Sequence, residues 1–293
     1  MREGRRRDLD GDRRHELEDR FDDFVRRNRF TIAVTFPVVG VVLLVASAEG
    51  VIPEPYAYQP MLLLFGTAVM RLPLVAAIVP LLDRRASVMV GGLMGYAYAI
   101  EFVGITTGWP YGEFAYQISL GPMVGGIPIG LPVFFIPLVV NAYLLTVLLL
   151  GPRAESRFVR LPATLATIMV IDLVLDPGAV ALQFWSFGGG AFYGVPFSNY
   201  AGWLLSGTVA VFALDAAFAR TELLDRLETT EFALDDMVSF VLLWGGVNVF
   251  YGNWFSAALA VALLGGLVAT DRFDVVFQGT ATAERVEKWV RRG

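Results

Sequence analysis

The chain has 293 residues, of which 56% are hydrophobic and 17% charged, with a net charge of −5 and no cysteine. Soluble domains carry about 25% charged residues, so this composition indicates an integral membrane protein. The missing cysteines exclude disulfides and thiolate chemistry, and the one histidine, His15, stands in a charged segment that argues against histidine metal sites. The acidic balance gives no reason to expect a nucleic-acid partner. All but one of the 23 basic residues are Arg, and such an acidic, lysine-poor chain suggests a salt-adapted organism.

Long apolar blocks follow one another along the chain. A helix needs about 20 mostly apolar residues to cross a bilayer core about 30 Å thick. The candidate spans are 30–48, 60–82, 86–106, 128–150, 160–182, 200–219, 236–251 and 254–271. The last two are short, and a re-entrant pair is their alternative. The predicted fold class is all-α, a polytopic integral membrane helical bundle of about eight transmembrane helices.

Basic residues divide the connecting segments into two sets. Arg and Lys occur before residue 30, in 83–85, 151–160 and 220–236, and after residue 271. The alternate loops, 49–59, 107–127, 183–199 and 252–253, contain none. Because cytoplasmic loops carry the excess of Lys and Arg, both termini are predicted to be cytoplasmic and the basic-free loops to face outward.

The two ends of the chain differ from the apolar middle. The predicted organisation is a charged cytoplasmic tail over 1–29, a membrane domain over 30–271 and a cytoplasmic tail over 272–293. Apolar residues at helical spacing predict a helix on the membrane surface in each tail. They are Leu17, Phe21, Phe24 and Val25 in the first tail, and Val286, Trp289 and Val290 in the second.

Five ionisable side chains lie within the predicted spans: Arg71, Glu101, Asp172, Asp176 and Asp215. Each costs about 2.5–3.5 kcal/mol at mid-bilayer, so such residues are functional candidates by default. For Arg71 a structural ion pair with one of the acids is as plausible as a functional role. Asp215 stands a turn from a cytoplasmic loop, which favours solvation at the helix end.

The remaining three acids fall at similar depths. At about 1.5 Å per residue, Glu101 lies about 22 Å and Asp176 about 24 Å into spans that both run outward. Asp172 is one turn deeper on the same face as Asp176. Two carboxyls this close in an apolar setting do not both ionise cheaply, so one is expected to keep its proton. Pro177 is predicted to kink or end the helix and to free backbone carbonyls beside the pair.

Two outer loops rich in aromatic residues, Gly and Pro, 107–127 and 183–199, are predicted to cover these acids. Some of their aromatic side chains fit an interfacial belt, but the glycine-rich turns indicate loops folded against the protein. A proton donor in an aromatic pocket suits protonation of an isolated carbon–carbon double bond, because aromatic faces stabilise a nearby cation. Water captures that cation. Such a hydration needs neither a metal nor an organic cofactor, and none is expected.

Two motifs carry a resemblance to a known family. They are Glu101-x-x-Gly104-x-x-Thr107-Gly108-x-Pro110-Tyr111-Gly112-x-x-x-Tyr116, and Asp172-x-x-x-Asp176-Pro177 followed by Trp185 and YGVPFSNYAGW, which ends at Trp203. Over roughly residues 90–210 the chain resembles the membrane carotenoid hydratase family. The resemblance implies addition of water to the terminal double bonds of an acyclic carotenoid. For the haloarchaeal branch, which the composition favours, it implies bisanhydrobacterioruberin as substrate and bacterioruberin as product. It also implies a multi-pass protein of the cell membrane, whose partners are the carotenoid, membrane lipids and, as an open possibility, other carotenoid-pathway enzymes.

The residue roles are inferred from this sequence. Asp172 and Asp176 are the expected proton-donating pair, and Glu101 is expected to position water or accept its proton, although the acid and base roles are interchangeable at this point. Thr106 is a further hydrogen-bonding candidate. The expected substrate-binding residues are Arg71, Thr107, Trp109, Tyr111, Tyr116, Trp185, Tyr193, Asn199 and Trp203.

Two other functions compete with hydration. A membrane prenyltransferase is suggested by the spacing of Asp172 and Asp176, which resembles a motif that chelates Mg²⁺ and diphosphate. That class needs a second such motif and basic residues near the cytoplasmic face, whereas the loops around this pair contain no Arg or Lys. A proton-coupled transporter would also explain buried acids, but no internal repeat supports it.

Overall fold

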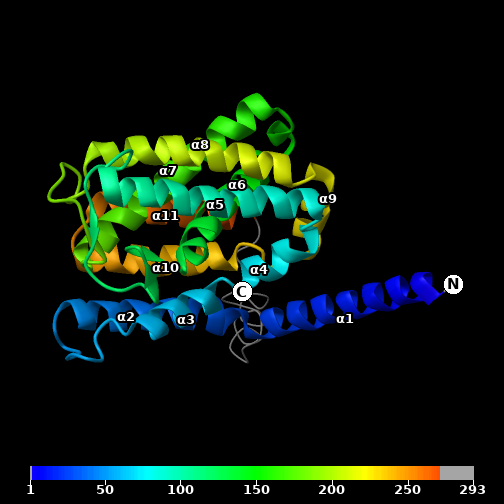
Figure 1. Ribbon diagram of the computed structural model, residues 1–293, viewed down its shortest axis with the longest axis horizontal. Coiled ribbons are helices and arrows are strands. Elements are labelled where there is room, and N and C mark those ends of the chain that lie inside the picture. Colours follow the sequence, from blue (N-terminus) through cyan, green and yellow to red (C-terminus); the bar gives the residue numbers. More distant parts are fainter. Residues whose placement is uncertain (1, 271–293) are drawn as a thin grey trace, which may run out of the picture.

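A computed structural model describes residues 2–270, with side chains from residue 13 onward, and consists mainly of helices (Figure 1). The α-helices are α1 (Arg2–Phe30), α2 (Phe36–Ala48), α3 (Pro60–Met70), α4 (Leu72–Ile78), α5 (Arg84–Thr107), α6 (Leu131–Leu150), α7 (Arg157–Ala181), α8 (Phe197–Ala217), α9 (Arg220–Thr229), α10 (Asp235–Phe250) and α11 (Trp254–Ala269). A π-helical turn, η1 (Thr31–Thr35), joins α1 to α2, and two 3-10 turns are η2 (Val79–Leu81) and η3 (Gly151–Glu155). The predicted all-α class is confirmed.

Each predicted span contains helix, but not every helix is long enough to cross a bilayer by itself. Five uninterrupted helical segments are long and apolar enough, and α3 with α4 and η2 forms a sixth candidate that is bent by 46°. Both α10 and α11 have only 16 residues, which is about 24 Å of helix. The described residues therefore contain five or six candidate spans.

The ends of the bundle keep the division seen in the sequence. The basic-free end consists of the loops 49–59, 108–130, 182–196 and 251–253. Four short strands stand there: β1 (Ala115–Tyr116), β2 (Met123–Val124), β3 (Ile127–Pro128) and β4 (Trp185–Ser186). Strands β1 and β4 pair antiparallel, as do β2 and β3. The β1–β4 pair joins the two aromatic loops, so these loops are folded against the protein as their glycine-rich turns indicated.

The most enclosed helices among the described residues are α6 and α10. Helix α7 packs against α6, α8, α10 and α11, while α5 and α8 pack together on one side (Figure 1). The core is almost entirely aliphatic and aromatic, with Ile168, Ile171 and Leu144 among its fully buried side chains. In this arrangement α7, which carries the acid pair, is surrounded by protein.

The first tail is helical, and its position on the membrane surface stays a prediction. Helix α1 continues through η1 into α2 without a break and extends beyond the bundle (Figure 1). Val25 is fully buried against Ala76 and Phe232, with Phe21 packed on the same cluster, so part of the apolar stripe meets protein rather than lipid. The predicted helix of the second tail, around Trp289, lies outside the described residues.

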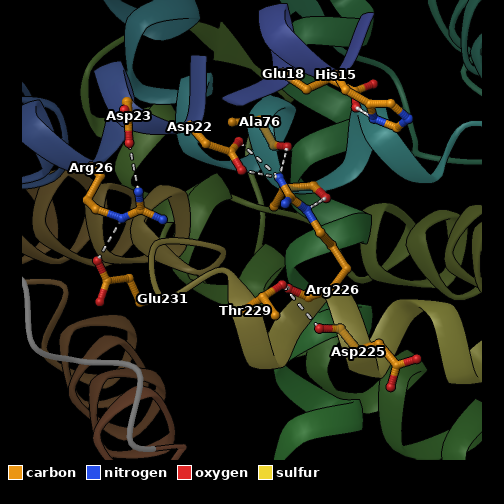
Figure 2. Close-up of polar contacts among 11 residues, drawn as sticks. His15, Glu18, Asp22, Asp23, Arg26, Ala76, Asp225, Arg226, Thr229 and Glu231 are labelled. Atoms are coloured by element: carbon orange, nitrogen blue, oxygen red, sulfur yellow. Dashed lines mark hydrogen bonds and ion pairs between the residues drawn. The ribbon is translucent and has the colours of Figure 1, made fainter. Parts of the chain in front are cut away.

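Ion pairs attach α1 to the rest of the molecule (Figure 2). Arg226 of α9 lies 2.7 Å from Asp22 and donates to the Ala76 carbonyl at 2.9 Å, and Arg26 lies 3.3 Å from Glu231.

The predicted solvation of Asp215 at a helix end is wrong. Its carboxylate is paired with Arg160, which reaches it from α7.

Candidate functional site

A cavity of about 470 Å³ lies inside the bundle beneath the loops of the basic-free end. Its walls come from α2, α3, α5, α6, α7, α8 and α10 and are predominantly apolar. This volume is within the range of about 300–1,000 Å³ typical of ligand sites. Eight of the predicted site residues line it: Arg71, Glu101, Tyr111, Tyr116, Asp176, Trp185, Asn199 and Trp203.

The acid pair of α7 faces the inside of the protein, and only one member reaches the cavity. Asp176 lines the cavity, whereas Asp172 is fully buried one turn behind it. Neither oxygen of Asp172 accepts a bond from an N–H group or a neutral hydroxyl within the described part of the chain. The two carboxyls are close enough to interact with each other. Two neighbouring carboxyls in an apolar setting do not both ionise cheaply, so the pair is expected to hold one proton.

Asn199, near the start of α8, orients the cavity-facing acid. Its side-chain amide donates a hydrogen bond to Oδ2 of Asp176. That bond leaves Oδ1 of Asp176 to meet Asp172 or a molecule in the cavity. An amide donor stabilises the ionised form of the carboxyl that it contacts, so the arrangement has the proton resting on Asp172.

The third acid, Glu101 of α5, lies across the cavity in contact with an aromatic loop. It accepts a hydrogen bond from the hydroxyl of Tyr116 in β1, and it is close enough to Asp176 to interact with it electrostatically. Burial, with Glu101 nearby, raises the pKa of the Tyr116 phenol well above its usual value, so Tyr116 remains a donor. Strand β4 holds it in place, since Tyr116 pairs with Trp185 and the two rings meet edge to face at 6.3 Å.

Pro177 does not end the helix, because α7 continues to Ala181. The predicted free carbonyl is present. A proline lacks the N–H that would bond the carbonyl four residues earlier, which here belongs to Leu173. The Ser256 hydroxyl of α11 donates to that carbonyl at 2.7 Å. Asn248 of α10 donates to the next carbonyl, that of Val174, also at 2.7 Å.

Sequence reasoning missed Ser256 and Asn248, together with Asn253, which donates to the Pro177 carbonyl at 3.2 Å. All three are buried polar residues of the last two helices and of the turn that joins them. The signal that would have found them is a polar side chain in an apolar span. These residues bond the α7 backbone around Asp172 and Asp176 and so fix where the acids point.

Aromatic side chains form part of the cavity wall. Tyr111 is buried, and its hydroxyl lies 2.6 Å from the Ser206 hydroxyl. A Cβ at Gly202 would lie only 2.3 Å from the Tyr111 ring, so glycine is required there for the loop to approach α8. Trp203 stacks on Phe135 of α6 at 5.8 Å. The predicted aromatic lining is therefore found for Tyr111 and Trp203.

Tyr58, which sequence reasoning did not select, also lines the cavity. Its hydroxyl donates to the Leu182 carbonyl at 2.7 Å, just beyond the end of α7. Burial and the neighbouring Glu49 raise the pKa of Tyr58 to about 12, so the phenol stays neutral.

Arg71 stands at the break between α3 and α4 and makes a buried ion pair. Its partner is Asp236 at 2.5 Å, and Asn141 donates to the other oxygen of Asp236, also at 2.5 Å. Its Nε bonds the Val133 carbonyl at 3.2 Å, which is free because Pro137 has no N–H. The structural ion pair is thus present, although Asp236 was not among the acids considered from the sequence. Arg71 also lines the cavity.

Four predicted residues lie away from the cavity. Thr107 accepts a bond from the Trp109 backbone and donates to the Val103 carbonyl, so it closes the end of α5. Trp109 itself is 58% exposed. The Tyr193 hydroxyl accepts from the Phe255 backbone at the start of α11. Thr106 bonds carbonyls of its own helix. The loop motifs therefore contain structural residues beside those that reach the cavity.

Comparison with known proteins extends this picture along the chain. The model of the carotenoid biosynthesis protein family matches residues 58–267, which covers the bent second span and the last two helices as well as the motifs. The chain is 62% identical over 255 residues, 87% of each chain, to a Haloarcula japonica protein named bisanhydrobacterioruberin hydratase. No solved structure matches. On this evidence the chain belongs to the carotenoid biosynthesis protein family.

Proposed function

We propose that the protein is a carotenoid hydratase that adds water to the terminal double bonds of bisanhydrobacterioruberin and forms bacterioruberin. The observation that carries the proposal is its 62% identity, over most of both chains, to the Haloarcula japonica protein of that name. The cavity is consistent with it, since an apolar, aromatic-lined space meets a set of buried carboxyls beneath the basic-free loops.

Asp176 is the proposed proton donor because it is the member of the pair that reaches the cavity. The proton that rests on Asp172 first passes to Oδ1 of Asp176, its neighbour one turn along α7. The π electrons of the double bond then take that proton from Asp176 and form the new C–H bond, which leaves a tertiary cation and an ionised acid pair. The faces of Tyr111, Trp185 and Trp203 stabilise the cation at short range.

Glu101 is the proposed base. Water adds its oxygen to the cation and releases one proton to the Glu101 carboxylate, which Tyr116 holds in place. Return of that proton to the acid pair completes the cycle, so the sum is one water added per double bond. Glu101 and Asp176 line the same cavity, which suits such a return, and a positioned acid or base contributes about 10²–10⁴-fold to a rate.

The proposed setting is the cell membrane, with eight spans, cytoplasmic termini and the basic-free end outside. The partition of Arg and Lys supports this orientation. It places the cavity near the outer interface, where water is available and where one end of a long polyene lies.

The test is expression of the full chain in a host that makes bisanhydrobacterioruberin, followed by mass analysis of the pigments. Conversion to products heavier by one and two water molecules is expected. Asp176→Asn should lower the hydration rate at least 100-fold. Glu113→Gln, the control, changes an exposed carboxyl of the loop that follows α5, outside the cavity lining, and should leave the rate unchanged. Unaltered pigment with the native chain would refute the function, and full activity of Asp176→Asn would refute the assignment of the acid.

A further inference from the structure

Helices α2 and α3 lie side by side along one edge of the bundle (Figure 1). Three side chains that line the cavity from these two helices are also exposed: Val39 is 48% exposed, Leu62 56% and Phe65 60%. From these exposed lining residues we infer that the cavity reaches the surface at α2 and α3, here called the α2–α3 opening. All three are apolar and lie within candidate spans, so the opening faces the lipid.

A polar cluster, Arg71 with Asp236 and Asn141, stands at the opposite end of the cavity from the loops. Gly178 of α7 and Trp244 of α10 lie at the same depth, because a Cβ on Gly178 would lie 3.0 Å from the Trp244 side chain. Both helices run toward the loops. Asp176 is two residues before Gly178 and Asp236 is eight residues before Trp244, so at about 1.5 Å per residue Asp236 lies about 9 Å deeper than Asp176. A charged pair buried among three helices, with its hydrogen bonds already made, offers no path to an apolar chain.

The substrate is longer than this space. An acyclic carotenoid has a length comparable to the bilayer core, about 30 Å, so only an end segment fits between the aromatic loops and the polar cluster. The rest of the chain must leave the cavity sideways. The α2–α3 opening suits this exit, because Val39, Leu62 and Phe65 line the cavity, are apolar and belong to candidate spans.

We propose that the α2–α3 opening is a binding site for the non-reacting part of the isoprenoid chain, which passes through it into the bilayer while one end occupies the cavity. This inference rests on the proposed function for its ligand. Each binding event then exposes one end to the acids. A two-ended substrate is hydrated in two separate encounters, leaving and re-entering through the same opening, so the singly hydrated carotenoid is released between them.

The absence of cysteine allows a test with single introduced thiols. Leu62→Cys and Val39→Cys place a thiol at the opening, and Phe212→Cys, 59% exposed on α8 and outside the cavity lining, is the matched control. After labelling with a bulky maleimide in detergent, the Leu62 and Val39 variants should hydrate the carotenoid at least 10-fold more slowly than before labelling. The labelled Phe212 variant should keep its rate. Equal rates before and after labelling at both opening positions would overturn the site.

A second measurement does not depend on hydration. In the Asp176→Asn background, a fluorescent maleimide on Leu62→Cys should be quenched when bisanhydrobacterioruberin binds, because the polyene absorbs beside the label, and the label on Phe212→Cys should be quenched much less. Equal quenching at the two positions would overturn the proposed site. Selective quenching at Leu62 in a chain whose native form adds no water would uphold the site and count against the hydratase function.

Discussion

Removal of the Ser256 hydroxyl tests whether Pro177 and Ser256 act together to hold the acid-bearing helix. Ser256→Ala deletes the donor to the Leu173 carbonyl, which is buried and lacks its helical partner because of Pro177. An unsatisfied buried carbonyl costs about 1–3 kcal/mol, while polar contacts within membrane bundles average about 0.6 kcal/mol and reach about 1.7 kcal/mol. We expect a loss of about 1 kcal/mol, a factor of about 5 in the folding equilibrium.

The interaction energy between Pro177 and Ser256 is the decisive measurement. Pro177→Ala restores an N–H that can bond the Leu173 carbonyl, so in that background Ser256→Ala should cost close to nothing. The native protein, the two single variants and the double variant form a double-mutant cycle, from which we expect an interaction energy of about 1 kcal/mol. The free energies of unfolding are measured in mixed micelles with rising SDS. Thr208→Ala, whose hydroxyl bonds only its own helix, should cost the same in both backgrounds. An equal cost of Ser256→Ala with and without Pro177 would refute the reasoning.

Three further outcomes follow from the site. Turnover in D₂O should place one deuterium on the carbon next to each new alcohol, read by mass spectrometry, and its absence would contradict protonation by an acid. Tyr116→Phe should lower the rate about 10-fold by removing the donor to Glu101, with pigment binding retained in an absorbance titration; unchanged turnover would show that this bond is not used. Arg71→Met should destabilise the fold by about 3–5 kcal/mol, because it leaves Asp236 buried and unpaired, and Arg71→Met with Asp236→Leu should recover most of the loss in the same SDS assay.

The apolar blocks and the division of Arg and Lys were sufficient to predict a helical membrane bundle with basic and basic-free ends. Number and length were harder. Helices α10 and α11 have only 16 residues each and pack against α7 as an antiparallel pair, and hydropathy alone does not show whether helices this short cross the bilayer. The bend at Arg71 does have a signal in the sequence, because Pro73 at the start of α4 has no N–H to continue the hydrogen bonds of α3.

The acids and several aromatic residues of the cavity were predicted correctly as groups that lie together, because intramembrane charge is costly and must face protein. Which of the two acids reaches the cavity was not predicted. One turn of α7 separates Asp176, which reaches the cavity, from Asp172, which does not, and periodicity places both on one face. Thr107 and Trp109 were assigned to the cavity because they belong to the same motif as Tyr111, yet a loop that covers a site also needs residues that end its helix.

The burial of Asp236 is the feature of the site that the sequence reveals least. It is the second residue of α10, a place where an acid ordinarily reaches solvent, but the helix begins inside the bundle and Arg71 is its partner.

Pro137 and Pro177 follow one rule in this protein. Each frees a carbonyl, and a side chain from a helix distant in sequence, Arg71 or Ser256, occupies it. Since one contact lies at the polar cluster below the cavity and the other beside the acids, the two prolines fix both ends of the space in which an isoprenoid end would react.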